Sequence, residues 1–378
     1  MSQFKNTLIA GLAMFAMFFG SGNLVFPIAL GVETQAGYTT AAIGLLLTGI
    51  FVPFLGLFSM ILYQGDRNAY FSELGKWAPF ACSLLMLSLL GPFGVVPRCA
   101  IVAYGGVNLL WADLPYHVFG LFFFTLVALI VWQKNKFVPL IGKWLAPFKI
   151  VGIALLILVA LWQAPQLEGT ALSANNFYAG FLKGYLIMDL PAAFFFCVTI
   201  VDYLKQSCPN KSAIMKTSII ASFIGGGLIA IFYIGFVVLG AHYSAELKDA
   251  QPEQYLPMIT NLTLGKYATL ILAVTMFLAC LTTAASLSRL FADFLQKDLS
   301  KNKLSWPVAI VITLVLSYSL SLIGFAAIST ILGEILRYVY PALIVLTIAL
   351  ILKHYLGFAY IRLSFWIAIL VTIGLQLI

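Results

Sequence analysis

The sequence contains few charged residues and few of the side chains that most enzymes use for catalysis. Only 9% of its 378 residues are Asp, Glu, Lys or Arg, and it has three histidines and five cysteines. Soluble domains carry roughly 25% charged residues, whereas 62% of this chain is hydrophobic. This balance excludes a soluble globular protein, a disordered protein and a nucleic-acid binder. It indicates an all-α protein that spans a membrane many times.

The rare cysteines and histidines form no recognisable ligand or catalytic pattern. No CxxC or zinc spacing occurs, so we expect neither a disulfide framework nor a transition-metal site. No HExxH motif and no buried acidic pair is present, which argues against an intramembrane protease and predicts no enzymatic activity. The cysteines are Cys82, Cys99, Cys197, Cys208 and Cys280, and the histidines are His117, His242 and His354.

Apolar stretches long enough to cross a bilayer occur eleven times. We interpret the first as a retained helix rather than a signal peptide, because no small-residue cleavage motif follows it. Only short polar connections separate the stretches, so we expect a single transmembrane domain over residues 1–378. The stretches are 6–30, 37–63, 79–111, 116–133, 143–162, 177–204, 213–240, 257–292, 306–325, 329–352 and 359–377.

The basic residues predict the orientation of these spans. With the N-terminus in the cytoplasm, 16 of the 21 Lys and Arg residues fall on the cytoplasmic side, and Lys149 is counted among them. Cytoplasmic loops carry such an excess, so the net charge of +8 is interpreted as a topology signal. A multi-pass protein of a plasma membrane with a cytoplasmic N-terminus is expected, with the lipid bilayer as its surroundings.

The first span is interrupted in its middle by Gly20-Ser21-Gly22-Asn23, four residues before Pro27. Glycine weakens a helix interior by about 1 kcal/mol relative to alanine, and proline lacks the N–H that a helix needs. Unwound backbone at this depth is tolerated only where it is buried in protein or lines a cavity. The stretch therefore indicates either a binding site or a kink that packs closely against a neighbour.

The sixth span is interrupted at Asp189, two residues before Pro191. A charged residue at the bilayer centre costs at least about 2.5 kcal/mol, so such residues usually have a function. Asp189 also fits the N-cap of a second half-helix, which is compatible with a functional role.

The two interruptions lie in the first members of two groups of five spans. Five is odd, so the groups insert with opposite orientation, and paired broken helices of this kind point to a transporter binding site. We expect the LeuT-type architecture of inverted five-helix repeats with broken helices 1 and 6. The first repeat covers residues 1–165, the second covers 175–354, and an extra helix 11 covers 357–378.

The broken first helix offers binding groups for two kinds of ligand. Backbone N–H groups at Ser21, Gly22 and Asn23 suit a carboxylate, and carbonyls near Ala16 and Phe19 suit a cation. Span eight adds Ala279, Thr282 and Thr283. Hydroxyl and carbonyl oxygens are the ligands that hard cations prefer, although such threonines also bond their own helix. We predict a Na⁺ site at these positions.

Three further charged residues fall inside spans. Arg98 lies in span three beyond Gly91-Pro92, and an arginine there needs a partner or a water-filled cavity. Glu334 and Arg337 are three residues apart on one face of span ten. We expect internal ion pairs or a gate at these three residues.

Six short strings resemble the bacterial branched-chain amino acid:cation symporter family. They occur in family order over nearly the whole chain. They are Gly20-Ser21-Gly22-Asn23 with Phe26-Pro27, Gly91-Pro92 with Pro97-Arg98, Trp144-Leu145-Ala146-Pro147-Phe148-Lys149, Gly184-Tyr185-Leu186-Ile187-Met188-Asp189, Cys280-Leu281-Thr282-Thr283-Ala284, and Tyr340-Pro341.

The resemblance implies the LeuT-type fold of the amino acid–polyamine–organocation superfamily. It also implies uptake of leucine, isoleucine and valine across the bacterial inner membrane, driven by Na⁺ or H⁺. Substrate-binding residues would be Gly20, Ser21, Gly22, Asn23, Met188 and Asp189, and Ala16, Phe19, Ala279, Thr282 and Thr283 would form the Na⁺ site. The family usually has twelve helices against eleven here, which leaves a monomer or a homodimer open.

Three functions follow from these observations. The first is sodium-coupled symport of branched-chain amino acids into the cytoplasm by alternating access. The second is a broader neutral amino acid transporter that also takes methionine, or one that is coupled to protons through Asp189. The third is a membrane sensor or assembly protein that transports nothing.

Overall fold

The computed structural model describes residues 2–132, 146–167, 174–206 and 210–377, and these form helices joined by short connections. Each of the eleven predicted spans coincides with one or more helices. The first five spans contain α1 (Ser2–Phe18) and α2 (Ser21–Thr34); α3 (Tyr38–Leu46), the π-helical turn η2 (Leu47–Phe51) and α4 (Val52–Leu62); α6 (Ala78–Leu90) and α7 (Val95–Asn108); α8 (Tyr116–Trp132); and α10 (Ala146–Trp162).

The remaining six spans follow the same pattern, with one break and one long kinked helix. They contain α11 (Ala174–Ile187) and α12 (Asp189–Lys205); α13 (Lys211–His242); α15 (Tyr255–Phe294), which is kinked at Gly265; α16 (Trp306–Ser321); α17 (Phe325–Leu356); and α18 (Ile361–Leu377). Shorter elements are η1 (Gln35–Gly37), α5 (Arg67–Ser72), α14 (Ser244–Leu247), η5 (Pro252–Gln254) and η6 (Leu295–Leu299).

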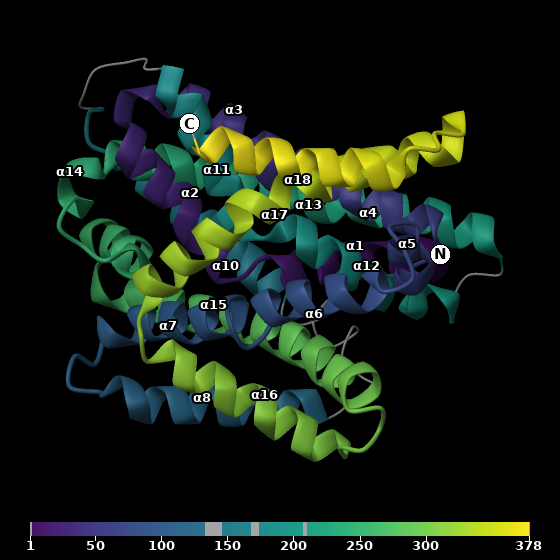
Figure 1. The fold of residues 1–378 in the computed structure, drawn as a ribbon. Coiled ribbons are helices and arrows are strands. Elements are labelled where there is room, and N and C mark those ends of the chain that lie inside the picture. The colour runs from purple at the N-terminus through teal and green to yellow at the C-terminus, as the bar shows by residue number, and fades with distance from the viewer. Residues whose placement is uncertain (1, 133–145, 168–173, 207–209, 378) are drawn as a thin grey trace.

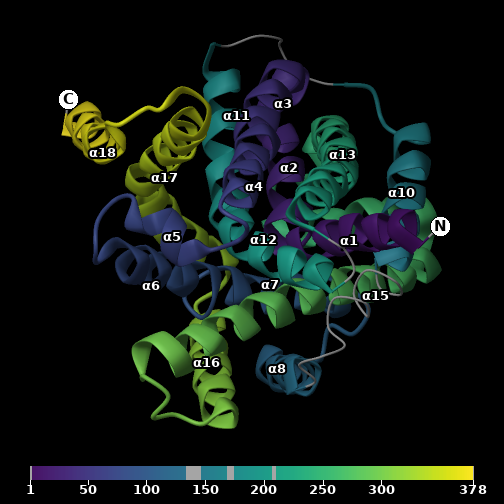
Figure 2. The same cartoon turned by 90° about the vertical axis from the view of Figure 1, so that its right-hand side faces the viewer.

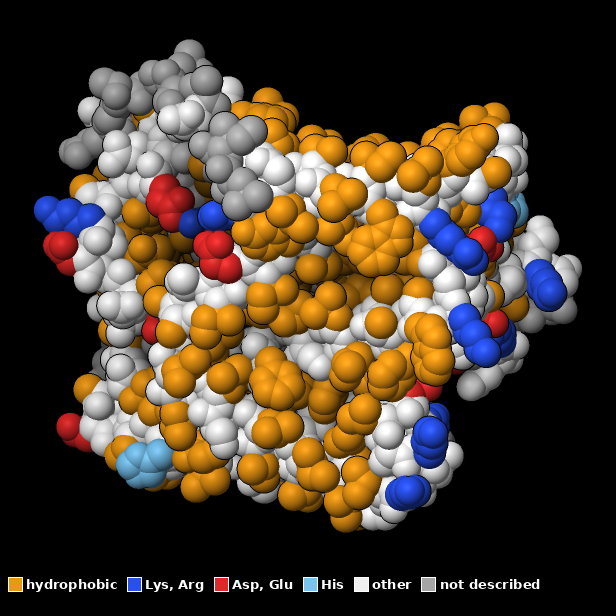
Figure 3. Space-filling model, viewed as in Figure 1, with side chains coloured by type: hydrophobic (Ala, Val, Ile, Leu, Met, Phe, Trp, Pro, Cys, Tyr) orange, Lys and Arg blue, Asp and Glu red, His pale blue; other side chains and the backbone are white. Residues whose placement is uncertain are grey.

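Six helical stretches in the described ranges are long and apolar enough to cross a membrane, and five apolar helices are shorter. Their outward faces carry large hydrophobic side chains such as Phe122, Val311 and Leu370. Figure 3 shows this apolar belt, with most of the visible Lys and Arg side chains at the end where Figure 1 places the N-terminus. A belt of this kind faces lipid rather than water, so the chain is a multi-pass membrane protein.

The broken helices lie in the interior of the bundle. α13 packs against both α1 and α2, α11 packs against α3, and α15 crosses α7 and α10. Figure 2 shows α1, α2 and α12 surrounded by other helices, whereas α8, α16 and α18 lie at the periphery. The residues predicted to form the site are therefore held inside the protein, where unwound backbone is protected from lipid.

Candidate functional site

The first helix break lies between Phe18, where α1 ends, and Ser21, where α2 begins. The N–H of Gly20 donates to Asn23 Oδ1 at 2.9 Å, so the Asn23 amide closes the start of α2. A Cβ atom added at Gly20 would lie 2.7 Å from Thr283 Oγ1 on α15. Glycine is favoured here because a Cβ atom would collide with the Thr283 side chain.

The second break lies between α11 and α12, at Met188. This residue has φ 68° and ψ 25°, in the left-handed region. A non-glycine residue in this region costs on the order of 1–3 kcal/mol and is retained mostly at functional sites. The Met188 side chain is almost completely buried, so the surrounding helices hold the strained conformation in place.

Asp189 follows directly and turns its carboxylate toward the first break. Asn23 Nδ2 donates to Asp189 Oδ2 at 3.1 Å, and the Tyr233 hydroxyl donates to the same oxygen at 2.9 Å. Asn23 also donates to the Tyr233 oxygen. The Asp189 side chain makes no capping bond to α12, so the N-cap alternative from the sequence is not what the structure shows. These contacts join both breaks to α13.

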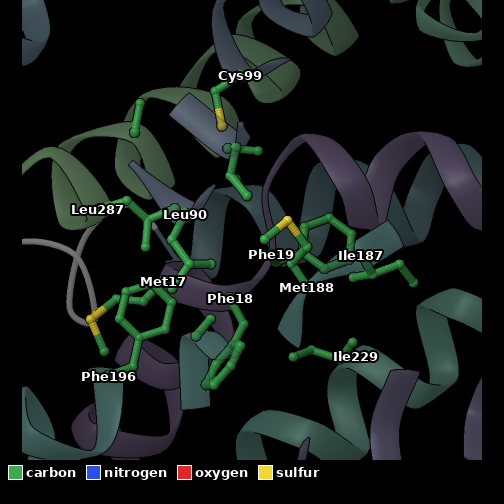
Figure 4. Close-up of a cluster of buried hydrophobic side chains, with 14 of the residues drawn as sticks. Met17, Phe18, Phe19, Leu90, Cys99, Ile187, Met188, Phe196, Ile229 and Leu287 are labelled. Atoms are coloured by element: carbon green, nitrogen blue, oxygen red, sulfur yellow. The ribbon is translucent and has the colours of Figure 1, made fainter. Parts of the chain in front are cut away.

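All six predicted substrate-binding residues line one small pocket between the breaks, whose free space of about 10 Å³ is roughly that of one water molecule. One end of the cavity is polar, with Ser21, Asn23 and Asp189. The rest is apolar, and Figure 4 shows Phe18, Leu90, Met188, Phe196 and Leu287 gathered there from several helices. The full lining is Phe18, Gly20, Ser21, Gly22, Asn23, Leu90, Val95, Ile187, Met188, Asp189, Ala192, Phe196, Thr283 and Leu287.

The structure brings together four of the five residues predicted to bind Na⁺. The Thr282 hydroxyl lies 3.1 Å from the Ala16 carbonyl oxygen and 2.9 Å from that of Ala279. The fifth residue, Thr283, donates its hydroxyl to the Met17 carbonyl at 3.0 Å and so joins α15 to α1 instead.

Lys149 on α10 lies among the residues predicted to bind Na⁺, although the sequence did not single it out. Its side chain is completely buried. Its Nζ lies 3.1 Å from Ala16 O, 3.2 Å from Phe19 O and 3.1 Å from Thr282 Oγ1. Lys149 was counted among the basic residues of the cytoplasmic side, but its buried side chain does not belong to an exposed loop. The sequence did contain one indication of its burial, because Lys149 lies within span five, directly after Pro147-Phe148, and is followed by an apolar stretch.

Arg98 is also completely buried, yet in the described part of the chain it has no ion pair. Its Nη1 donates to Leu186 O at 3.0 Å, and Nη2 lies 3.6 Å from Met188 Sδ. The rings of Phe26 and Phe325 lie 5.3 and 5.9 Å from the guanidinium carbon. The predicted ion pair is thus replaced by a helix-end carbonyl and two aromatic faces.

Glu334 and Arg337 pair with each other at 3.6 Å, with 60% and 46% of their side chains exposed. The predicted pair exists, but it lies on the surface of α17 and not in the interior. Several other predictions lie outside the described residues: the loop lysines Lys134, Lys136 and Lys143, the motif residues Trp144 and Leu145, and Cys208.

The amino-acid sequence matches a known protein family. The family model described as "Branched-chain amino acid transport protein" matches residues 3–377. The branched-chain amino acid permease BrnQ of Corynebacterium glutamicum is 27% identical over 352 residues, which cover 90% of this chain and 80% of the relative. The branched-chain amino acid transport system 3 carrier protein of Pseudomonas aeruginosa is 29% identical over 351 residues, covering 90% of this chain and 79% of the relative.

Two solved transporter structures share the fold at low sequence identity. MhsT in complex with L-phenylalanine superimposes with a TM-score of 0.62 and 14% identity, covering 97% of each chain. The inward-facing conformation of Mhp1 gives a TM-score of 0.60 and 12% identity, covering 96% of this chain and 88% of that chain. Both have the LeuT-type fold, so the predicted all-α LeuT-type architecture is confirmed.

Proposed function

The chain belongs to the family of branched-chain amino acid transport proteins, as its motifs predict, and we propose that it carries leucine, isoleucine and valine into the cytoplasm by alternating access. It is a transport protein and not an enzyme. The observation that carries the proposal is the cavity between the two helix breaks. This cavity combines a polar end suited to an amino acid backbone with an apolar wall suited to an aliphatic side chain.

Each part of such a substrate has a complementary group in the cavity. The first N–H groups of α2, at Ser21 and Gly22, have no carbonyl one turn back and suit the carboxylate. The Asp189 carboxylate suits the amino group and is held in place by Asn23 and Tyr233. Phe18, Leu90 and Phe196 suit the side chain.

The coupling ion remains part of the proposal. The sequence predicts Na⁺, with H⁺ as the alternative. The Na⁺ prediction requires space between Ala16, Phe19 and Thr282, and the amine of Lys149 lies in that space. This observation favours the proton, and Asp189 is the acidic group nearest to the proposed substrate.

The proposed setting is the bacterial inner membrane with the N-terminus in the cytoplasm. The concentration of Lys and Arg at the N-terminal end of the molecule supports this orientation through the positive-inside rule. A sensor or assembly protein would need no cavity between two broken helices, so the structure favours transport over that alternative. A monomer and a homodimer both remain compatible with the proposal, as does methionine as an additional substrate.

The test is uptake of labelled leucine into proteoliposomes, in competition with each of the twenty amino acids. We expect isoleucine and valine to compete best and charged amino acids not to compete. Ser21→Phe, which places a ring in the cavity, should abolish uptake, while Ser319→Phe on the outer face of α16 serves as the control. If no aliphatic amino acid enters, or if Ser21→Phe transports normally, the proposed function is wrong.

A further inference from the structure

The predicted cation site has oxygen ligands but no room for a free ion. Carbonyl and hydroxyl oxygens of Ala16, Phe19 and Thr282 converge on one point, as a hard cation requires. Lys149 Nζ occupies that point, 3.1–3.2 Å from all three oxygens. Hard cations such as Ca²⁺ are held at about 2.3–2.6 Å, so an ion within reach of these oxygens would collide with the amine. The residues present therefore do not fit bound Na⁺.

The number of acceptors matches a charged amine. A lysine ammonium has three donors and no acceptor, and three oxygens surround this one. The Thr282 hydroxyl has the Ala279 and Ala16 carbonyls as acceptors at 2.9 and 3.1 Å, which leaves its oxygen free to accept from Lys149. The rings of Phe15 and Phe19 lie 5.9 and 6.0 Å from Nζ and add a cation–π contribution.

The position of Lys149 in its own helix does not account for this arrangement. The three oxygens around its amine belong to Ala16, Phe19 and Thr282, and none of them lies in the described part of α10. The last carbonyls of α1 form a negative helix end that attracts a positive charge. The side chain thus links α10, α1 and α15 through contacts that a bound cation would otherwise make.

The site is connected to the substrate cavity through the unwound backbone. Phe19 O accepts from Lys149, and the N–H of the same peptide group, at Gly20, donates to Asn23 Oδ1. Asn23 then donates to Asp189. A charge held at the end of α1 therefore orders the residues that line the cavity.

We propose that the amine of Lys149 takes the place of the coupling Na⁺, so that this transporter binds its substrate without sodium. The inference rests on the proposed function only in taking leucine as the substrate. It assigns Lys149 as a positioning residue that holds helix 1 in its broken conformation.

The first experiment measures the purified full-length chain in NaCl and in choline chloride of equal ionic strength. We expect leucine affinity and unfolding temperature to be the same in both salts. Leucine binding that requires Na⁺, or unfolding at a clearly higher temperature in NaCl without leucine, would overturn the inference. If leucine binds in neither salt, the proposed substrate fails, while the unfolding measurement still tests the inference.

The second experiment separates a replaced ion from a simple helix cap. Lys149→Ala opens the space between the oxygens, so Na⁺ should raise its unfolding temperature and its leucine affinity by about tenfold. Lys149→Met fills the same space without charge and should gain nothing from Na⁺. Lys205→Ala is the matched control, because Lys205 pairs with Asp202 at the surface.

If Na⁺ leaves Lys149→Ala unchanged, Lys149 replaces no ion and the inference is wrong. Lys149→Ser provides the same opened space if the alanine variant cannot be purified. The comparison of the wild-type protein in NaCl and choline chloride tests the inference without any variant.

Discussion

The two helix breaks both end against a buried positive charge, yet the charges are satisfied differently. At the first break, Lys149 meets three oxygens, which belong to Ala16 of α1, Phe19 in the break and Thr282 of α15. At the second, Arg98 meets a single carbonyl of α11, at Leu186, together with a thioether and two rings. The Arg98 Nε has no hydrogen-bond partner among the described residues.

This difference indicates which break is rigid and which one can rearrange when substrate binds. A buried donor without a partner costs about 1–3 kcal/mol, and the strained Met188 adds to the second break. The first break has a compact set of hydrogen bonds on both sides of Gly20. We infer that helix 1 is held rigidly near Lys149, whereas the α11–α12 junction has more to gain from rearrangement when substrate binds.

The largest expected effect comes from removing each charge in turn. Lys149→Met removes the amine that three buried oxygens accept from, whereas Arg98→Met removes a donor from a single carbonyl. Each loss costs about 1–3 kcal/mol, so Lys149→Met should lower the unfolding temperature more. Thermal unfolding of both variants beside the wild type measures this. An equal or larger decrease for Arg98→Met would contradict the contrast between the breaks.

The next largest effect concerns substrate binding at the second break. Asp189→Asn keeps the shape of the side chain and removes the charge proposed to meet the amino group. Hydrogen bonds to charged groups contribute about 1.5–3 kcal/mol, so leucine affinity should fall about tenfold to a hundredfold. Asp202→Asn, whose parent side chain is 58% exposed, is the control. Unchanged leucine affinity in Asp189→Asn would exclude a direct role for this carboxylate.

Close packing at the first break gives a third, smaller effect. The Cβ of Gly20→Ala would lie 2.7 Å from Thr283 Oγ1, whereas that of Gly22→Ala would lie 3.2 Å from Ile187 Cα. Overpacking typically costs about 1–3 kcal/mol, so Gly20→Ala should be the more damaging variant for stability and uptake. Adding Thr283→Ala should recover part of the loss. The reverse order would show that the first break is the looser one.

The smallest effect is expected at the ion pair on α17. Glu334 and Arg337 are largely exposed, and exposed pairs contribute about 0–1 kcal/mol. Glu334→Gln should therefore leave leucine uptake close to the wild-type rate. Loss of uptake in this variant would instead support the gate that was expected at Glu334 and Arg337 from the sequence.

The positions of the breaks were predictable because their causes are local. Gly20 weakens a helix and Pro191 fits only near a helix start, so both favour the breaks beside them, whereas Pro27 lies inside α2. The periodic apolar stretches likewise predicted the helices, because bilayer thickness determines their length. The oxygens of Ala16 and Thr282 could be predicted as neighbours once the broken first helix suggested the fold.

The partners of the buried charges were not predictable, because they depend on how distant helices pack. In the sequence, Lys149 resembles an ordinary cytoplasmic lysine near a loop. Only the packing of α10 against α1 and α15 shows that its side chain is buried. Tyr233 lies in an apolar stretch, and only the packing of α13 brings its hydroxyl to Asp189. Arg98 was expected to need a partner or a water-filled cavity, but the sequence does not reveal that a helix-end carbonyl and two aromatic faces surround it.

The most direct test of the account is leucine counterflow in proteoliposomes, with unlabelled leucine inside and labelled leucine outside. This exchange needs no ion gradient, so it reports the cavity and the cation site together. We predict the same accumulation of label in NaCl and in choline chloride, and none with Ser21→Phe. Accumulation only in NaCl would contradict the role of Lys149, and no accumulation in either salt would contradict the proposed transport.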